Sequence, residues 1–350
     1  MFFKSNAYLC SVCFLLAELA GANNYWEAFR PGPPTICSHG GEYAYMARTG
    51  TVNNVIVEFE GGGCCYSGLT CLGPTYTRTV SVRDELNSLK NSGGIRSQSD
   101  PRNPFLGWSH LYIPYCTGDA HMGNKTPGYG VHHAGQVNAK AALEWLKTNV
   151  SNNPGKVFVT GGSAGSVASY VWAPKIFDMY PNSEHYHLGD SYAPLFGEAG
   201  YNGGLDNWDS LSSYDRRVKG MDIGRWRDYI SASNLNATAR TYPKAMFASY
   251  ISNRDPVQTS FYIFEGCGAE KCNWKKAFRN AIALVHNGIK ADNLDNYASF
   301  VSPSNIHVIT ESDEMYNVVS ENISFVDWLR DLVYGNGNVT REVDCLGDGC

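Results

Sequence analysis

Residues 157–170, VFVTGGSAGSVASY, constrain the fold more than any other stretch of this 350-residue chain. Four strand-forming residues lead into two glycines, Ser163, Ala164 and a third glycine, and a helix-like sequence follows. A sharp strand-to-helix turn needs small residues around its tip, because the backbone reverses there at close range. The stretch predicts either a nucleophile elbow that carries Ser163 or a purely structural turn.

Strand and helix patterns alternate along the rest of the chain. Apolar, β-branched runs predict strands at residues 55–59, 111–114, 156–160, 244–251 and 305–309. Helical spacing predicts helices at residues 136–150, 166–172, 274–289 and 325–334. This alternation predicts an α/β-hydrolase-like α/β fold, with a mostly parallel central sheet and helices on both faces. Residues 73–107 and 194–242 fit the pattern poorly, and we expect them to form a lid over the C-terminal end of the strands.

The N-terminus has the pattern of a secretory signal peptide over residues 1–22. Lys4 precedes an apolar segment at residues 7–19, and Ala20, Gly21 and Ala22 form a small-residue cleavage site. The apolar segment is too short for a membrane span, and no later run is long enough. We therefore expect a secreted protein with a single domain over residues 23–350. The formal charge of -5, without a basic block, argues against a nucleic-acid partner.

The cysteines agree with an oxidising compartment. The chain has eleven, and removal of Cys10 and Cys13 with the leader leaves an odd number. Disulfides are then the default, and close spacing favours the pairs Cys267–Cys272 and Cys345–Cys350. A zinc site is the alternative, but no histidine lies at ligand spacing from these pairs. Five sequons predict a glycosylated surface; their asparagines are Asn124, Asn149, Asn236, Asn322 and Asn338.

A nucleophilic serine needs a base, and in an elbow fold the base is a histidine that follows the acid in the chain. His307 lies after a loop at residues 302–305, which suits a base, whereas His286 lies within a helical run. Asp255, in the loop after the strand at 244–251, is the predicted acid. Asp190 is the alternative acid; otherwise it lines the substrate pocket with the adjacent Ser191 or supports the elbow.

A second glycine-rich turn, EGGGCC at residues 60–65, follows an early strand. Acyl transfer passes through an oxyanion that backbone N–H groups must stabilise, and glycines allow close approach. We expect Gly62, Gly63 and Ala164 to supply these donors. A phosphate loop is the competing interpretation, but no Gly-Lys-Ser/Thr follows.

Together these stretches resemble the pectin acetylesterase / Notum family of secreted serine esterases. The matching segments are EFEGGGCC at 58–65, IPYCTGD at 113–119, HHAGQVNA at 132–139, GSAG at 162–165, GDS at 189–191 and SNIH at 304–307. The resemblance implies that Ser163 is the nucleophile, Asp255 the acid and His307 the base, with Gly62, Gly63 and Ala164 as the oxyanion hole. It also implies the disulfides Cys37–Cys116 and Cys65–Cys71, with Cys64 as the odd thiol.

Two departures from the family pattern concern the pocket. Plant and animal members usually carry a tryptophan beside the oxyanion glycines, whereas Cys64, Cys65 and Tyr66 follow here, closer to microbial members. Gly162 precedes the nucleophile where cysteine or another small residue is expected. The resemblance therefore supports ester hydrolysis more firmly than it supports pectin as substrate.

The sequence predicts a secreted, monomeric serine carboxylic-ester hydrolase that needs no metal or cofactor. Its expected substrate is an acylated carbohydrate, from which it removes acetyl groups, as from pectin. One alternative is a Notum-like deacylase that removes a longer acyl chain from a lipidated protein. Others are a serine peptidase and a catalytically dead binding protein on the same scaffold. Aromatic side chains in or beside the expected lid are candidates for stacking on sugar rings; they are Tyr192, Tyr201, Trp208 and Trp226.

Overall fold

The computed structural model describes residues 25–193, 198–218, 232–264, 282–283, 287 and 294–346. The predicted signal peptide, the Cys267–Cys272 pair and Trp226 lie outside these residues, as does most of the helix predicted at 274–289. No helix in the described part of the chain is long and apolar enough to cross a membrane.

A nine-stranded sheet forms the centre of the molecule, in the order β1-β2-β4-β3-β5-β6-β7-β8-β11. Strand β1 pairs antiparallel with β2, and β2 with β4, whereas all later neighbours are parallel. The strands are β1 (Glu27–Phe29), β2 (Tyr45–Arg48), β3 (Asn54–Phe59), β4 (Ser109–Ile113), β5 (Lys156–Gly162), β6 (Glu184–Asp190), β7 (Met246–Ser252), β8 (Tyr297–Ser302) and β11 (Glu342–Asp344). A separate small sheet pairs β9 (Val319–Ser320) with β10 (Ile323–Ser324). The predicted mostly parallel α/β fold is confirmed.

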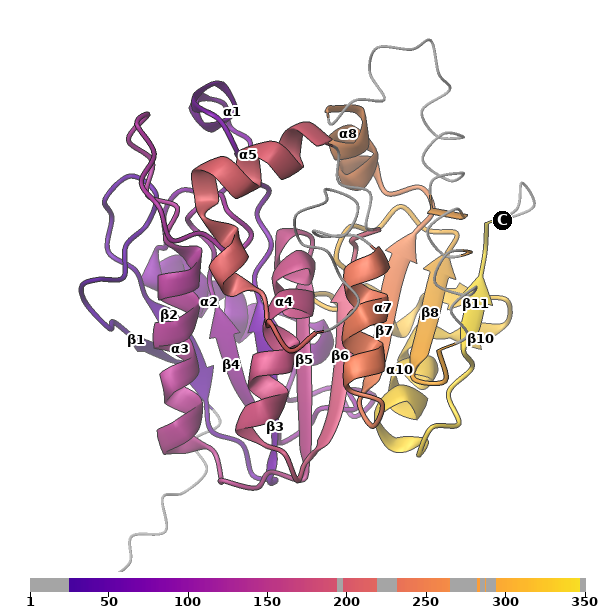
Figure 1. The fold of residues 1–350 in the computed structure, drawn as a ribbon. Helices are drawn as coiled ribbons and strands as arrows, with labels where there is room; N and C mark the ends of the chain where they lie inside the picture. The colour runs from indigo at the N-terminus through magenta and orange to yellow at the C-terminus, as the bar shows by residue number, and fades with distance from the viewer. Residues whose placement is uncertain are drawn as a thin grey trace, which may run out of the picture.

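Helices cover both faces of the sheet, as Figure 1 shows. On one face, α3 (Gly135–Asn149), α4 (Ala164–Met179) and α7 (Ala232–Thr241) pack against Val55, Val57 and the equivalent residues of the neighbouring strands. On the other face, α10 (Phe325–Tyr334) buries Trp328 against the side that carries Ile56 and Phe158. Because alternate residues of the central strands are buried on opposite faces, these strands are apolar almost throughout.

The segments expected to form a lid lie only partly over the C-terminal end of the sheet. In Figure 1, α1 (Gly68–Leu72), α5 (Glu198–Trp208) and α8 (Pro256–Phe264) lie above that end. However, α2 (Val82–Asn91) packs Leu89 against Met46 and Tyr112, and Ile95 and Phe105 join the core on the α10 face. The second half of residues 73–107 therefore covers a face of the sheet, because its apolar side chains are buried there.

The prediction of a strand at residues 305–309 is wrong. Strand β8 ends at Ser302, and the loop that follows is irregular, with a left-handed φ of 61° at Val308. Side chains at the end of β6, rather than a neighbouring strand, accept the N–H groups of Val308 and Ile309. We call residues 303–310 the histidine loop.

Two predicted disulfides, Cys37–Cys116 and Cys65–Cys71, are confirmed, and Cys64 keeps a buried thiol. Cys345 is disulfide-bonded as well, but Cys350 lies outside the described residues. The sequon asparagines are exposed at four positions: Asn124, Asn149, Asn322 and Asn338. The expected surface position is wrong for Asn236, which is only 6% exposed within α7.

Candidate active site

The turn between β5 and α4 places Ser163 in a strained backbone conformation, with φ 55° and ψ −119°. Its N–H donates to the carbonyl oxygen of Asp190 at 2.9 Å, which ties the turn to the end of β6. A Cβ atom on Gly165 would lie 1.9 Å from the carbonyl oxygen of Phe59, and one on Gly161 would lie 2.3 Å from that of Gly165. The small residues around Ser163 are therefore required by backbone contacts, and strain of this kind is typical of functional sites.

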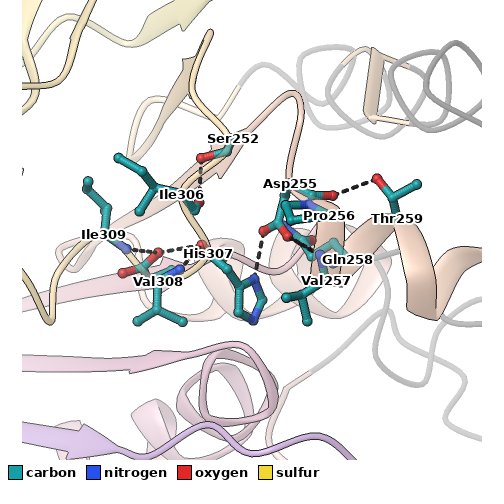
Figure 2. A network of polar contacts seen from close by, with 12 residues as sticks. Ser252, Asp255, Pro256, Val257, Gln258, Thr259, Ile306, His307, Val308 and Ile309 are labelled. Atoms are coloured by element: carbon teal, nitrogen blue, oxygen red, sulfur yellow. Dashed lines mark hydrogen bonds and ion pairs between the residues drawn. The ribbon is translucent and has the colours of Figure 1, made fainter. Parts of the chain in front are cut away.

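Asp255 and His307 form a hydrogen-bonded pair at the ends of β7 and β8. Figure 2 shows Nδ1 of His307 directed at Oδ2 of Asp255, 2.7 Å away. The Asp255 carboxylate is fully buried, and its Oδ1 accepts the N–H groups of Val257 and Gln258 in the first turn of α8. A helix N-terminus favours a negative charge, so the fold holds this carboxylate ready to orient the imidazole.

Asp190, the alternative acid, holds the histidine loop instead of the imidazole. Its Oδ2 accepts the N–H and the hydroxyl of Thr310 at 2.8 and 2.7 Å, and its Oδ1 accepts the N–H of Ile309 at 3.3 Å. Burial raises the pKa of Asp190, and these hydrogen bonds oppose that rise. Of the two predicted acids, only Asp255 contacts His307.

Ser191 links the same two segments. Its hydroxyl donates to Oδ1 of Asp190 at 2.8 Å and accepts the N–H of Val308 at 2.8 Å. Figure 2 shows Val308 and Ile309 next to His307 on this loop. Asp190 and Ser191 together fix the backbone that carries His307.

Ser163 and His307 line one pocket that is partly open to solvent. Gly63, Ala164 and Ser191 also line it, whereas Asp190 is fully buried behind it. The rest of the wall is largely apolar: Cys64, Ala120, Val167, Tyr192, Ala193, Trp208, Gln258, Phe261 and Tyr262. Among the described residues, no hydrogen bond joins the Ser163 hydroxyl to His307; such bonds are often long before substrate binds.

The glycine turn at residues 61–63, which we call the glycine loop, lies beside this pocket. Gly62 and Gly63 have φ angles of 139° and 77°, which disfavour other residues. The carbonyl oxygen of Gly62 accepts the N–H of Thr77, and the N–H of Cys64 donates to Thr75. Within the described part of the chain, the N–H groups of Gly62 and Gly63 have no hydrogen-bond acceptor, which leaves them available to a bound group.

Several pocket residues were not predicted from the sequence. Gln258 donates to Oδ2 of Asp255 at 3.0 Å and accepts the N–H of Ala193 at 2.6 Å. Gln258 could have been predicted from its position in the first helical turn after Asp255. Phe261 and Tyr262 follow on α8 without any motif. Of the aromatic candidates, Tyr192 and Trp208 line the pocket, whereas the side chains of Tyr201 and Trp226 are not described.

A parallel sheet with a strained serine between strand and helix, and an Asp–His pair after later strands, defines an α/β-hydrolase-like protein. A sequence model of the family described as "Pectinacetylesterase" matches residues 33–197. The similar relatives include pectin acetylesterase 11 of Arabidopsis thaliana, 26% identical over 42% of this chain. They also include palmitoleoyl-protein carboxylesterase notum2 of Xenopus laevis, 30% identical over 36% of this chain.

The structural comparison agrees over a longer stretch. A crystal structure of the Wnt deacylase Notum from Drosophila covers 89% of this chain and 93% of its own, with a TM-score of 0.65 at 19% identity. The sequence matches span 39% of the length of the Arabidopsis relative and 27% of that of the Xenopus relative. The chain is thus similar to the pectin acetylesterase / Notum family in sequence over part of its length, and it has the fold of Notum.

The elbow geometry makes a testable prediction about stability. Replacement of Gly165 by alanine forces a Cβ into the backbone of β3, and we expect it to lower the free energy of unfolding by at least about 2 kcal/mol. Gly128→Ala is the matched control, because nothing lies within 4 Å of its Cβ position. Urea unfolding of both variants measures the difference. Equal stabilities would contradict the close approach of α4 to β3.

Proposed function

We propose that this protein is a serine carboxylic-ester hydrolase with Ser163 as nucleophile, His307 as base and Asp255 as acid. The observation that carries the proposal is the 2.7 Å contact between Asp255 and His307, on a loop that lines the same pocket as Ser163. The similarity to the pectin acetylesterase / Notum family supports it, because the relatives in both branches are named as esterases. The serine, the histidine and the glycine loop are all retained, which argues against a catalytically dead binding protein.

The reaction is a two-step acyl transfer. With Nδ1 donating to Asp255, Nε2 of His307 accepts the Ser163 proton as Oγ attacks the ester carbonyl carbon. His307 then returns the proton to the leaving alcohol, and an acyl-enzyme on Ser163 remains. A water molecule gives its proton to His307 and attacks the acyl-enzyme, which releases the acid and restores Ser163.

The glycine loop stabilises the charge that develops on the carbonyl oxygen. The N–H groups of Gly62, Gly63 and Ala164 are the proposed donors, and Gly63 and Ala164 line the pocket beside Ser163. Backbone donors that are fixed before the reaction need no reorganisation as the oxyanion forms. The chemistry therefore requires only side chains and backbone of this chain.

The first substrate candidate is an O-acetylated polysaccharide such as pectin. It is supported by the family model and by the Arabidopsis relatives, which are named pectin acetylesterases. The second candidate is a longer acyl ester on a lipidated protein, because the Xenopus relative is named a palmitoleoyl-protein carboxylesterase. The apolar wall at Val167, Trp208 and Phe261 supports this second candidate, since a longer acyl chain buries more apolar surface against it than an acetyl group does. We also propose that the protein is secreted, which the two disulfides support.

Ser163→Ala and His307→Ala should each lower kcat/KM for p-nitrophenyl acetate by at least about 10³-fold, because nucleophile and base act as a unit. His132→Ala is the control, since the imidazole of this histidine bonds only to the Thr126 hydroxyl among the described contacts. It should keep activity within about twofold of wild type. Initial rates at fixed pH measure all three. Full activity of Ser163→Ala would refute the assignment.

A chain-length series on p-nitrophenyl esters separates the two substrate candidates. Preference for C2 supports deacetylation, and preference for C8 or longer supports the second candidate. In the second case Val167→Phe, which fills the pocket wall, should lower kcat/KM for C8 by about tenfold or more and spare C2. Val319→Phe, an exposed valine of β9, is the control. Equal losses for C2 and C8 would show that the acyl chain does not occupy this pocket.

A further inference from the structure

Glu60 is hydrogen-bonded to the end of β4 and to the segment that follows it. It is the first residue after β3 and immediately precedes the glycine loop. Its N–H donates to the carbonyl oxygen of Ile113 at 3.0 Å, and its carbonyl oxygen lies 2.9 Å from Nε2 of His121. Its Oε2 accepts the N–H of Tyr115 at 2.7 Å.

We propose that Glu60 is a positioning residue whose carboxyl group fixes the glycine loop in the conformation that binds the oxyanion. The inference rests on the proposed esterase function. Tyr115, whose N–H donates to this carboxyl group, also packs against Gly62: a Cβ on Gly62 would lie 2.8 Å from Cδ1 of the Tyr115 ring. The hydrogen bond between Glu60 and Tyr115 therefore helps to fix the position of the Tyr115 ring, against which the glycine loop packs.

The surroundings of Glu60 are strongly acidic. Glu85 of α2 and Glu311, the residue directly after the histidine loop, both act on its carboxyl group, and among the described residues the side chains of Tyr112 and Tyr43 also interact with it. Arg96, a buried cation of this region, is already engaged: it bonds to Glu58 at 2.6 Å and to Glu311 at 3.0 Å. Glu58 also bonds to the buried, neutral His110, whose pKa is lowered to about 4 mainly by burial.

Burial, and then the charge of Glu85, raise the pKa of Glu60 to about 8. Its carboxyl group is therefore protonated at neutral pH and fits among its acidic neighbours. Above that pH it becomes a carboxylate that Glu85 and Glu311 repel, which disturbs the glycine loop. The folded state holds this proton more tightly than the unfolded chain, so the group's contribution to stability is lost as pH rises from about 4.5 to about 8.

The test is the pH dependence of kcat/KM for p-nitrophenyl acetate, with Ser163→Ala as the blank. Wild type should lose about tenfold between pH 7 and pH 9. Glu60→Gln keeps the neutral hydrogen bonds and should abolish this alkaline loss, with activity at pH 7 within about threefold of wild type. Glu60→Ala removes the bonds and should lower kcat by at least about tenfold at every pH with little change in KM.

Glu85→Gln is the second variant, and a merely structural role for Glu60 does not predict its effect. Removal of the Glu85 charge lowers the pKa of Glu60, so the alkaline loss should begin at lower pH. Melting temperatures give an independent readout: between about pH 5 and pH 8, wild type should lose more stability than Glu60→Gln.

The outcomes distinguish this inference from the proposed function. If wild type shows no Ser163-dependent hydrolysis, the proposed function fails and the inference fails with it. If wild type is active but Glu60→Gln keeps the alkaline loss, or Glu85→Gln leaves it unmoved, only the role of Glu60 is overturned. Wild-type kcat in Glu60→Ala would overturn it as well.

Discussion

The geometry of the site depends on a single residue at the end of β6. The carbonyl oxygen of Asp190 accepts the N–H of Ser163, while its carboxyl group accepts the N–H groups of Ile309 and Thr310. Burial of a carboxyl group costs free energy unless its hydrogen bonds are satisfied. The folded protein therefore holds the histidine loop against the end of β6. Asp190 thereby brings Ser163 and His307, which are far apart in the sequence, to the same end of β6.

The remaining parts of the site come from neighbouring strand ends of the same sheet. β3 supplies the glycine loop, β5 the serine, β7 the acid and β8 the histidine. Parallel strands bring these ends to one edge, which is where ligands bind in open α/β sheets. The acidic cluster around Glu60 and Glu58 lies beside that edge, and Arg96 bonds both to Glu58 and to Glu311, the residue directly after the histidine loop. The proposed catalytic and positioning groups are therefore held at the same edge of the central sheet.

The sequence was informative where chemistry leaves few choices of residue. Gly161, Gly165 and the glycine loop were recognisable because backbone approaches these positions more closely than a Cβ allows. Asp255 was found from its place after a strand. The strand expected at residues 305–309 failed, because the apolar pattern there gives no sign that Asp190 and Ser191 take the backbone N–H groups.

The pocket wall could not be predicted for a different reason. Trp208 of α5 and Phe261 of α8 line the same pocket as Ser163, and only the folded chain brings them together. The face covered by Ile95 and Phe105 likewise depends on long-range packing that short patterns do not carry. The position of Glu60 next to the glycine loop is visible in the sequence. Its proposed role could not be predicted, because it depends on Glu85 and Tyr115, which are distant in sequence.

The most direct measurement of the central claim is peptide mapping by mass spectrometry after reaction with a fluorophosphonate. Such a reagent bonds covalently to a serine only when a base and oxyanion donors activate it. The account predicts one adduct, on Ser163, which His307→Ala suppresses while the protein stays folded. An adduct on another serine, or none on a folded and otherwise unmodified wild-type protein, would contradict it.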